Sequence, residues 1–293
     1  MTTNTIQADW KNQTQSVADA IRRRVLAHVL ANNGGYLSQA LSSAEIFSML
    51  YTRVLDIGPS TAPLTPRAFS GVPGPGNPDF FNGGEYNGPK APELDRFIFS
   101  PAHYALVLYT TLIEVGRLAE DGLDHFNRDG ATVEMIGAEH SPGIETTTGS
   151  LAQALSQAGG IALARKRRGD TGNVWVMMSD GEFQEGQIWE AISEAAKYGL
   201  DNLRVIADVN GQQCDGCILP EHYVEPLAPR IEAFGGSVSV VDGHDLEALD
   251  TAMAVETGKP HFVLAMTDPA RGLDLFEERA PLFHYLRFTS DEE

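Results

Sequence analysis

The sequence predicts an α/β protein with a parallel sheet flanked by helices on both faces. Three observations support this fold class. Strand-like and helix-like segments alternate four times after residue 170, and each strand is apolar along its whole length. Such strands are typical of a parallel sheet that is covered on both sides. The 293 residues contain no internal repeat and no clear domain boundary. We therefore expect a single domain over residues 1–293, with a core from about residue 17 to 285.

The first part of the chain predicts two helices and a long loop. Residues 17–33 form one helix that Gly34 and Gly35 end, and residues 42–58 form a second, with Ser42 or Ser43 as its N-cap. Residues 58–92 are too rich in Gly and Pro to continue either helix or strand. A loop of this length is expected to be functional or mobile.

The rest of the chain predicts regular strand–helix units. Residues 97–116 read as a short strand and a helix, with Ser100 as N-cap and Pro101 in the first helical position. Residues 149–169 form a helix rich in small residues, suited to close packing on a sheet. The remaining elements are strands at 173–179, 203–209, 237–243 and 261–267, and helices at 187–199, 226–235 and 245–258.

The charge balance limits the classes of partner. The chain has 21 Lys and Arg against 40 Asp and Glu, a formal charge of −19. A field of this sign repels nucleic acids and anionic membranes, so we expect neither as a partner. An anionic ligand requires a cation or oriented N–H groups at its site. The sequence has no apolar run long enough to span a bilayer and no secretory signal, and we expect a cytoplasmic protein.

The two cysteines, Cys214 and Cys217, form a single C-x-x-C. A structural zinc site requires a second pair of Cys or His ligands at suitable spacing, which the sequence lacks. Ordinary reduced thiols near a loop are the interpretation that this pattern favours.

Polar residues follow the predicted strands, where ligands bind in parallel sheets. Asp180 and Asn210 lie 30 residues apart at the ends of two successive strands. Their oxygens suit Mg²⁺ or Ca²⁺ rather than zinc, and Mg²⁺ commonly binds through few carboxylates together with a diphosphate. The alternative is structural, with Asp180 capping the next helix and Asn210 forming a turn.

Several segments resemble the transketolase family. Residues 179–216, SDGEFQEGQIWEAISEAAKYGLDNLRVIADVNGQQCDG, resemble its thiamine diphosphate signature, which runs from G-D-G to an Asn about thirty residues later. In the family's order, RFIFSPAHYALVLYTTLIEVG is similar to the S-x-G-H helix, PGIETTTGSLAQALSQAGGIALA to T-T-G-x-L-G-Q-G, and FGGSVSVVDGHDLEAL to F-G-W…V-D-G-H-D. The resemblance covers about residues 17–285 and implies the family's thiamine-diphosphate-binding fold.

The resemblance implies a role for specific residues. Asp180, Asn210 and the carbonyl of Gln212 would hold Mg²⁺. The cofactor would contact Gly149, Leu151, Asp180, Gly181, Glu182 and Asn210, with Leu151 on its aminopyrimidine ring. Glu185 resembles the acid at the subunit interface beside the cofactor. His103 matches the S-x-G-H histidine that contacts substrate, and His140 and His284 resemble two further active-site histidines. Histidine suits proton transfer because its pKa lies near neutrality.

The chain departs from the family pattern around the substrate. Tyr36 stands where the family has a histidine in G-H-x-G, and Ala102 replaces the Gly of S-x-G-H. The segment L-G-Q-G is Leu151-Ala152-Gln153-Ala154, Ser179 replaces the first Gly of G-D-G, and the T-x-K-G-x-G loop is reduced to residues 267–272. These changes leave the diphosphate anchor intact, so cofactor binding is expected, whereas an ordinary pentose phosphate substrate does not follow.

The length of the chain implies a partner. A full transketolase has two further domains, one of which binds the aminopyrimidine, and residues after 285 are too few to encode it. We expect the N-terminal subunit of a split transketolase, assembled as α2β2 with a separately encoded C-terminal-type subunit.

This enzyme would transfer a two-carbon ketol unit from a ketose to an aldehyde, with sugars or sugar phosphates as substrates. Two alternatives remain open: an acyloin or acyl transferase that uses a 2-oxo acid donor, and a non-catalytic scaffold subunit. The scaffold is disfavoured because the chain keeps the family residues at Asp180, Glu185 and Asn210.

Overall fold

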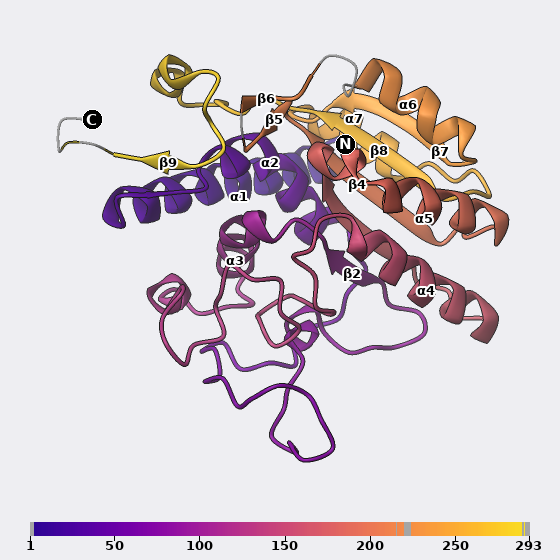
Figure 1. The fold of residues 1–293 in the computed structure, drawn as a ribbon, viewed down its shortest axis with the longest axis horizontal. Coiled ribbons are helices and arrows are strands. Elements are labelled where there is room, and N and C mark those ends of the chain that lie inside the picture. The colour runs from indigo at the N-terminus through magenta and orange to yellow at the C-terminus, as the bar shows by residue number, and fades with distance from the viewer. Residues whose placement is uncertain (1–2, 215, 220–223, 289, 291–293) are drawn as a thin grey trace.

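The fold is built on a five-stranded, fully parallel sheet, as a computed structural model of residues 3–214, 216–219, 224–288 and 290 shows (Figure 1). The strand order is β2-β3-β4-β8-β7. These strands are β2 (Arg96–Phe99), β3 (Val174–Ser179), β4 (Leu203–Val209), β7 (Ser237–Asp242) and β8 (His261–Met266). The predicted fold class and all four predicted strands after residue 170 are confirmed.

Helices cover both faces of the sheet. One group contains α1 (Thr3–Ala31), α2 (Ser38–Met49), α3 (Ala105–Glu114) and α7 (Leu246–Met253), and the other contains α4 (Gln153–Arg168), α5 (Gly186–Lys197) and α6 (Val224–Ala233). Figure 1 shows α4, α5 and α6 side by side along one side of the sheet. The chain advances across the sheet from β3 through β4 to β7 and then returns to β8. A right-handed crossover in the reverse direction requires its helix on the opposite face, which is where α7 lies.

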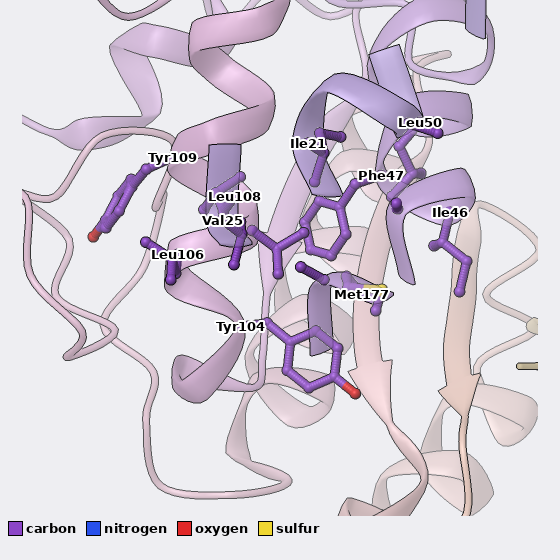
Figure 2. Packing of buried hydrophobic residues seen from close by; sticks show 14 of the residues in the cluster. Ile21, Val25, Ile46, Phe47, Leu50, Tyr104, Leu106, Leu108, Tyr109 and Met177 are labelled. Atoms are coloured by element: carbon purple, nitrogen blue, oxygen red, sulfur yellow. The ribbon is translucent and has the colours of Figure 1, made fainter. Parts of the chain in front are cut away.

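The alternation of side chains along the strands produces two apolar cores. On β3, Trp175 and Met177 face the α1–α2–α3 side, whereas Val174, Val176 and Met178 face α4 and α5. Since both faces are buried, the strand is apolar from Val174 to Met178. Figure 2 shows the first core, where Ile21 and Val25 of α1 and Phe47 of α2 pack near Met177. In the same view the ring of Tyr104 borders the cluster and its hydroxyl points away from it.

Both predicted helix caps are wrong. Helix α2 begins at Ser38 after Leu37, and the hydroxyl of Ser43 donates to the carbonyl of Gln39 inside the helix. Helix α3 begins at Ala105, after a 3₁₀ turn at Ala102–Tyr104, so Ser100 does not cap it. Ser42 and Ser100 instead bind buried acids from distant parts of the chain, which are described below.

The long segment over residues 58–92 lies apart from the carboxyl ends of the strands. It is irregular except for a 3₁₀ turn at Gly83–Asn87. Its backbone binds the segment that precedes α4, through Phe69 N to Gly130 O at 2.9 Å and Gly83 N to Glu139 O at 2.7 Å. Figure 1 shows it below the sheet, opposite the end where β5 (Gln212–Gln213), β6 (Gly216–Cys217) and β9 (Leu286–Arg287) lie.

The remaining short strands form two small antiparallel pairs. β5 and β6 make a hairpin, and β9 pairs with β1 (Gly34–Gly35) beside the end of α1. Among the described residues, no helix has the length and apolar character needed to cross a membrane. The prediction of a single domain over residues 1–293 remains a prediction.

Candidate active site

A cavity of about 430 Å³ opens at the carboxyl ends of β3 and β4. Its volume is in the range of small-molecule binding sites, and its place at the strand ends is where ligands bind in such sheets. It collects predicted site residues from five separate segments of the chain: His103, Leu151, Gly181, Glu185, Asn210, Gln212 and His284. No Lys or Arg lines it among the described residues.

Asp180 does not line the cavity itself, but it lies between Ser179 and Gly181, which both do. It follows β3, which is the neighbour of β4 in the sheet, so Asp180 and Asn210 lie on adjacent strand ends as predicted. Its carboxylate is 4% exposed and accepts hydrogen bonds from Gly181 N at 2.8 Å and Gly211 N at 2.7 Å. Burial, together with the nearby Asp208, raises the pKa of Asp180 to about 8. The fold therefore buries this acid without supplying a side-chain cation from the described residues.

Asp208 organises the floor of the site, and sequence reasoning assigned it no role. It is completely buried, and burial raises its pKa. Its carboxylate accepts hydrogen bonds from four side chains, Ser42, Tyr104, Asn210 and Thr267. One feature of the sequence indicates a role for Asp208: it lies two residues before Asn210, and alternate residues of a strand share a face.

This network fixes the orientation of Asn210. The amide nitrogen donates toward Asp208 Oδ2 and Tyr104 OH, both at 3.1 Å, and therefore points into the floor. The amide oxygen accepts Gln212 N at 2.9 Å and keeps a second lone pair. Asn210 itself lines the cavity. The network therefore leaves the amide oxygen of Asn210 as the atom that can bind a cation.

The residues present fit a hard divalent cation. A buried carboxylate, an oriented amide oxygen and nearby main-chain carbonyls match the oxygen ligands that Mg²⁺ prefers. The raised pKa of Asp180 means that its ionised form lacks a partner, which a bound cation would supply. No cluster of three or more His, Cys, Asp or Glu suited to a metal occurs in the described ranges, so other oxygens must complete the coordination.

Glu182 has a different place from the one predicted. Its carboxylate is 0% exposed and lies outside the cavity lining, so the structure does not indicate a side-chain contact with the cofactor. It binds the hydroxyl of Ser100 and, at 2.9 Å each, the main-chain N–H groups of Ala152 and Ser179. Burial raises its pKa, against these hydrogen bonds. Glu182 therefore joins the ends of β2 and β3 to the start of α4.

The start of α4 carries a backbone constraint of its own. Ala152, where the family pattern has Gly, is held at φ 72°, a conformation that costs a residue with a Cβ atom about 1–2 kcal/mol. Its N–H group is the one that Glu182 accepts. Gly149, three residues earlier, has φ 101° and lies beside Ala102, although it does not line the cavity.

Two predicted histidines meet Tyr36 in an aromatic cluster. The ring centroids of His103 and His284 are 5.1 Å apart, and those of Tyr36 and His284 are 5.4 Å apart. Burial lowers the pKa of both histidines, with His284 adding to the effect at His103. Both imidazoles are therefore neutral near pH 7, and each is a weaker base than a free imidazole. Burial raises the pKa of Tyr36, so its hydroxyl keeps its proton.

His140 and the rim residues differ in position. His140 does not line the cavity, and its Nε2 lies 2.7 Å from Glu134 Oε1 while its ring packs on Phe69. Leu151 is 41% exposed and Glu185 is exposed at the start of α5, so both lie on the outer rim of the cavity. An exposed leucine next to a polar cavity is a feature that a ligand or partner can cover.

Comparison with protein families gives one match. Residues 81–270 match the family model described as "Transketolase, thiamine diphosphate binding domain". The matched range contains Asp180 and Asn210 at the strand ends, and it also contains Glu182 and His103.

Similar proteins include subunits of about this length. A putative uncharacterized transketolase family protein of Sinorhizobium fredii is 35% identical over 94% of this chain and 90% of its own length. One of the subunits of an apulose-4-phosphate transketolase from Actinobacillus succinogenes is 33% identical over 96% of this chain and 93% of its own. The 6-deoxy-6-sulfo-D-fructose transketolase subunit SqwG of a Clostridium species is 30% identical over 94% and 92%.

Solved structures share the fold. Transketolase from Campylobacter jejuni superposes with a TM-score of 0.66 at 25% identity, covering 87% of this chain and 38% of the other. A transketolase mutant from Pichia stipitis gives a TM-score of 0.69 at 25% identity, with 87% and 36% covered. The chain thus spans little more than a third of these larger transketolases and has their thiamine-diphosphate-binding fold. From the family match and the similarity over nearly its whole length, the chain belongs to the transketolase family.

Proposed function

We propose that this chain is the N-terminal, thiamine-diphosphate-binding subunit of a two-component transketolase. It transfers a two-carbon ketol unit from a ketose to an aldehyde acceptor. The observation that carries the proposal is the strand-end cavity lined by Ser179, Gly181 and Asn210, in a chain that aligns with separate transketolase subunits over nearly their whole length.

Asp180, the amide oxygen of Asn210 and the main-chain carbonyl of Gln212 hold Mg²⁺ in this proposal. The cavity lacks Lys and Arg among the described residues, so a cation would be needed to neutralise a diphosphate in this strongly acidic protein. Leu151 at the rim would contact the aminopyrimidine, and Gly149, which lies beside Ala102, would contact the cofactor through its backbone. Once bound, thiamine diphosphate supplies the carbanion chemistry of ketol transfer.

His103 and His284 move protons at the substrate. Both line the cavity and both are neutral near pH 7, so each imidazole has a nitrogen that can accept a hydrogen bond from a substrate hydroxyl. Proton transfer to either ring requires that bound substrate and cofactor raise its pKa from the lowered value. Tyr36 keeps its phenolic proton and donates a hydrogen bond where the family has a histidine. His140 pairs with Glu134 outside the cavity. Its predicted active-site role requires the segment that carries both residues to close over the site in the assembly.

The partner subunit covers the exposed rim. Glu185 and Leu151 face outward beside the cavity, and the names of two relatives identify them as subunits of transketolases. We propose an α2β2 assembly in the cytoplasm, in which the partner supplies the aminopyrimidine site and the cations for any substrate phosphate. Size measurement by light scattering on the co-purified complex tests the stoichiometry.

The decisive experiment is a titration of the co-purified pair with thiamine diphosphate and Mg²⁺, followed by assays with ketose phosphates, free ketoses and pyruvate. We expect cofactor-dependent activity with a ketose donor that Asp180→Ala abolishes. Asp129→Ala, which removes an exposed acid with no hydrogen bond or ion pair in the structure, is the matched control. Full activity of Asp180→Ala would refute the site. A preference for pyruvate would replace ketol transfer by acyl or acyloin transfer, and absence of cofactor binding would leave a scaffold.

A further inference from the structure

The two cysteines of the chain lie at the edge of the cavity. Cys214 lines it, and Cys217 belongs to β6 of the adjoining hairpin. Both thiols are free and exposed. They are the only cysteines in the 293 residues, and the proposed transfer reaction uses neither.

The hairpin brings the segments that carry the two cysteines together. Gln212 pairs with Cys217 and Gln213 with Gly216, and Cys214 follows β5 at the turn. Gln212 Nε2 lies 3.7 Å from Cys217 Sγ.

A disulfide requires α carbons about 4.4–6.8 Å apart. The pairing of Gln213 with Gly216 holds the residues next to the two cysteines on neighbouring strands, as this bond needs. Gly216, at φ 119°, provides a backbone position that adapts as the bond closes.

We propose that Cys214 and Cys217 form a reversible intrachain disulfide that weakens binding at the adjoining cavity. The oxidant is a low-molecular-weight disulfide such as oxidised glutathione. The thiolate of Cys214 attacks one of its sulfurs, forms a mixed disulfide and releases one reduced thiol. The thiolate of Cys217 then attacks the Cys214 sulfur, closes the intrachain bond and releases the second thiol. Two protein thiols are oxidised and one small disulfide is reduced.

The hairpin transmits this change to the cavity because it is attached on both sides. Gln213 Oε1 accepts Gln184 Nε2 at 2.8 Å, which ties β5 to the segment after Asp180. Gly216 on β6 packs against Pro281, three residues before His284. Drawing Cys214 toward Cys217 also moves Gln212, whose amide N–H holds the oxygen of Asn210. Mutation of a group that orients a metal ligand typically costs 10–100-fold in affinity, so displacement of Gln212 should weaken binding in the same direction.

The disulfide itself is tested by intact mass. Incubation of the full chain with oxidised glutathione should remove two hydrogen atoms from its mass, and a reducing thiol should restore them. Cys214→Ser and Cys217→Ser should each retain a glutathione adduct instead, because the resolving thiol is absent. Stable glutathione adducts on the wild-type chain, or no reaction at all, would overturn the proposal.

The effect of the disulfide on cofactor binding is tested by titrating thiamine diphosphate and Mg²⁺ into the oxidised and the reduced chain, each together with the partner subunit. This arm depends on the proposed function. We expect about tenfold weaker binding after oxidation, and no effect of the oxidant on the Cys214→Ser/Cys217→Ser double variant. Equal affinities of the two forms would refute the coupling. Failure of the reduced protein to bind would refute the proposed function, while the mass measurement would still decide the disulfide.

Discussion

Two buried carboxylates show how differently this chain treats its acids. Glu45 in α2 is 2% exposed and binds Arg22 of α1 at 2.7 Å and His244 Nδ1 at 3.0 Å. Burial opposes its ionisation, but the hydrogen bonds from His244 and Arg22 lower the pKa of Glu45 to about 2. Asp180 is buried to a similar extent, has only main-chain donors, and its pKa rises to about 8.

The difference separates a structural acid from a binding acid. The groups that stabilise Glu45, the guanidinium of Arg22 and the ring of His244, come from other segments of the same chain, so these contacts are complete when the protein folds. The cation that would stabilise ionised Asp180 is absent from the described residues and must come with a ligand. A buried charge without a partner destabilises a fold, which is a cost that natural proteins accept mainly at functional sites.

The largest expected effect is on the function of Asp180. Asp180→Asn should lower cofactor-dependent activity by about a thousandfold, equivalent to about 4 kcal/mol, because it removes the only carboxylate of the proposed metal site. The free energy of unfolding without cofactor, measured by urea denaturation, should stay the same or increase. A strongly destabilised variant would show that Asp180 is a structural acid like Glu45.

Glu45 should show the opposite pattern. Glu45→Gln leaves the guanidinium of Arg22 without its charged partner and should lower the free energy of unfolding by about 3 kcal/mol. Cofactor affinity, measured at a temperature where the variant remains folded, should change little. The double variant Arg22→Met/Glu45→Met is the matched control, since it removes both charges and should recover part of the stability.

The pH dependence of stability should distinguish the same two acids. Because the pKa of Glu45 is lowered from 4.5 to about 2, its contribution is complete above pH 4.5 and is lost as the pH falls toward 2. We expect the wild type to lose about 2–3 kcal/mol across this window through Glu45. Urea midpoints measured over this range should fall less in Glu45→Gln, and parallel curves for the two proteins would contradict the assignment.

Glu182 offers an intermediate case with neutral donors only. Ser100→Ala removes one of its hydrogen bonds and should destabilise the fold by about 1.5 kcal/mol. Ser43→Ala, whose hydroxyl donates only to the carbonyl of Gln39 within α2, should cost less than about 1 kcal/mol and serves as control. Thermal unfolding of both variants measures the difference, and equal effects would show that Glu182 does not depend on Ser100.

The elements that could be predicted are those fixed by local pattern. The apolar runs at residues 173–179 and 203–209 became β3 and β4 with bounds that agree to within one residue. The order of the motifs led to Asp180 and Asn210 on adjacent strand ends, since the carboxyl ends of parallel strands lie at one edge. Sequence patterns determine these features because each depends on neighbours in the chain or on a periodicity of two.

The failures share a different cause. Ser42 and Ser100 have the residue type and position of helix caps, but their hydroxyls bind Asp208, 166 residues away, and Glu182, 82 residues away. His140 has the motif position of an active-site histidine and pairs with Glu134 outside the cavity, so its active-site role stays a prediction.

The sequence by itself determined the alternation of strands and helices, the strand ends that carry the acids, and the family signature. Only the tertiary structure decided which acid is paired with a cation, which is held by neutral donors, and which is left for a ligand. The physical reason is that the pKa and role of a buried carboxylate depend on the groups that the fold brings within hydrogen-bonding distance. Those groups come from distant parts of the chain, so no local pattern contains them.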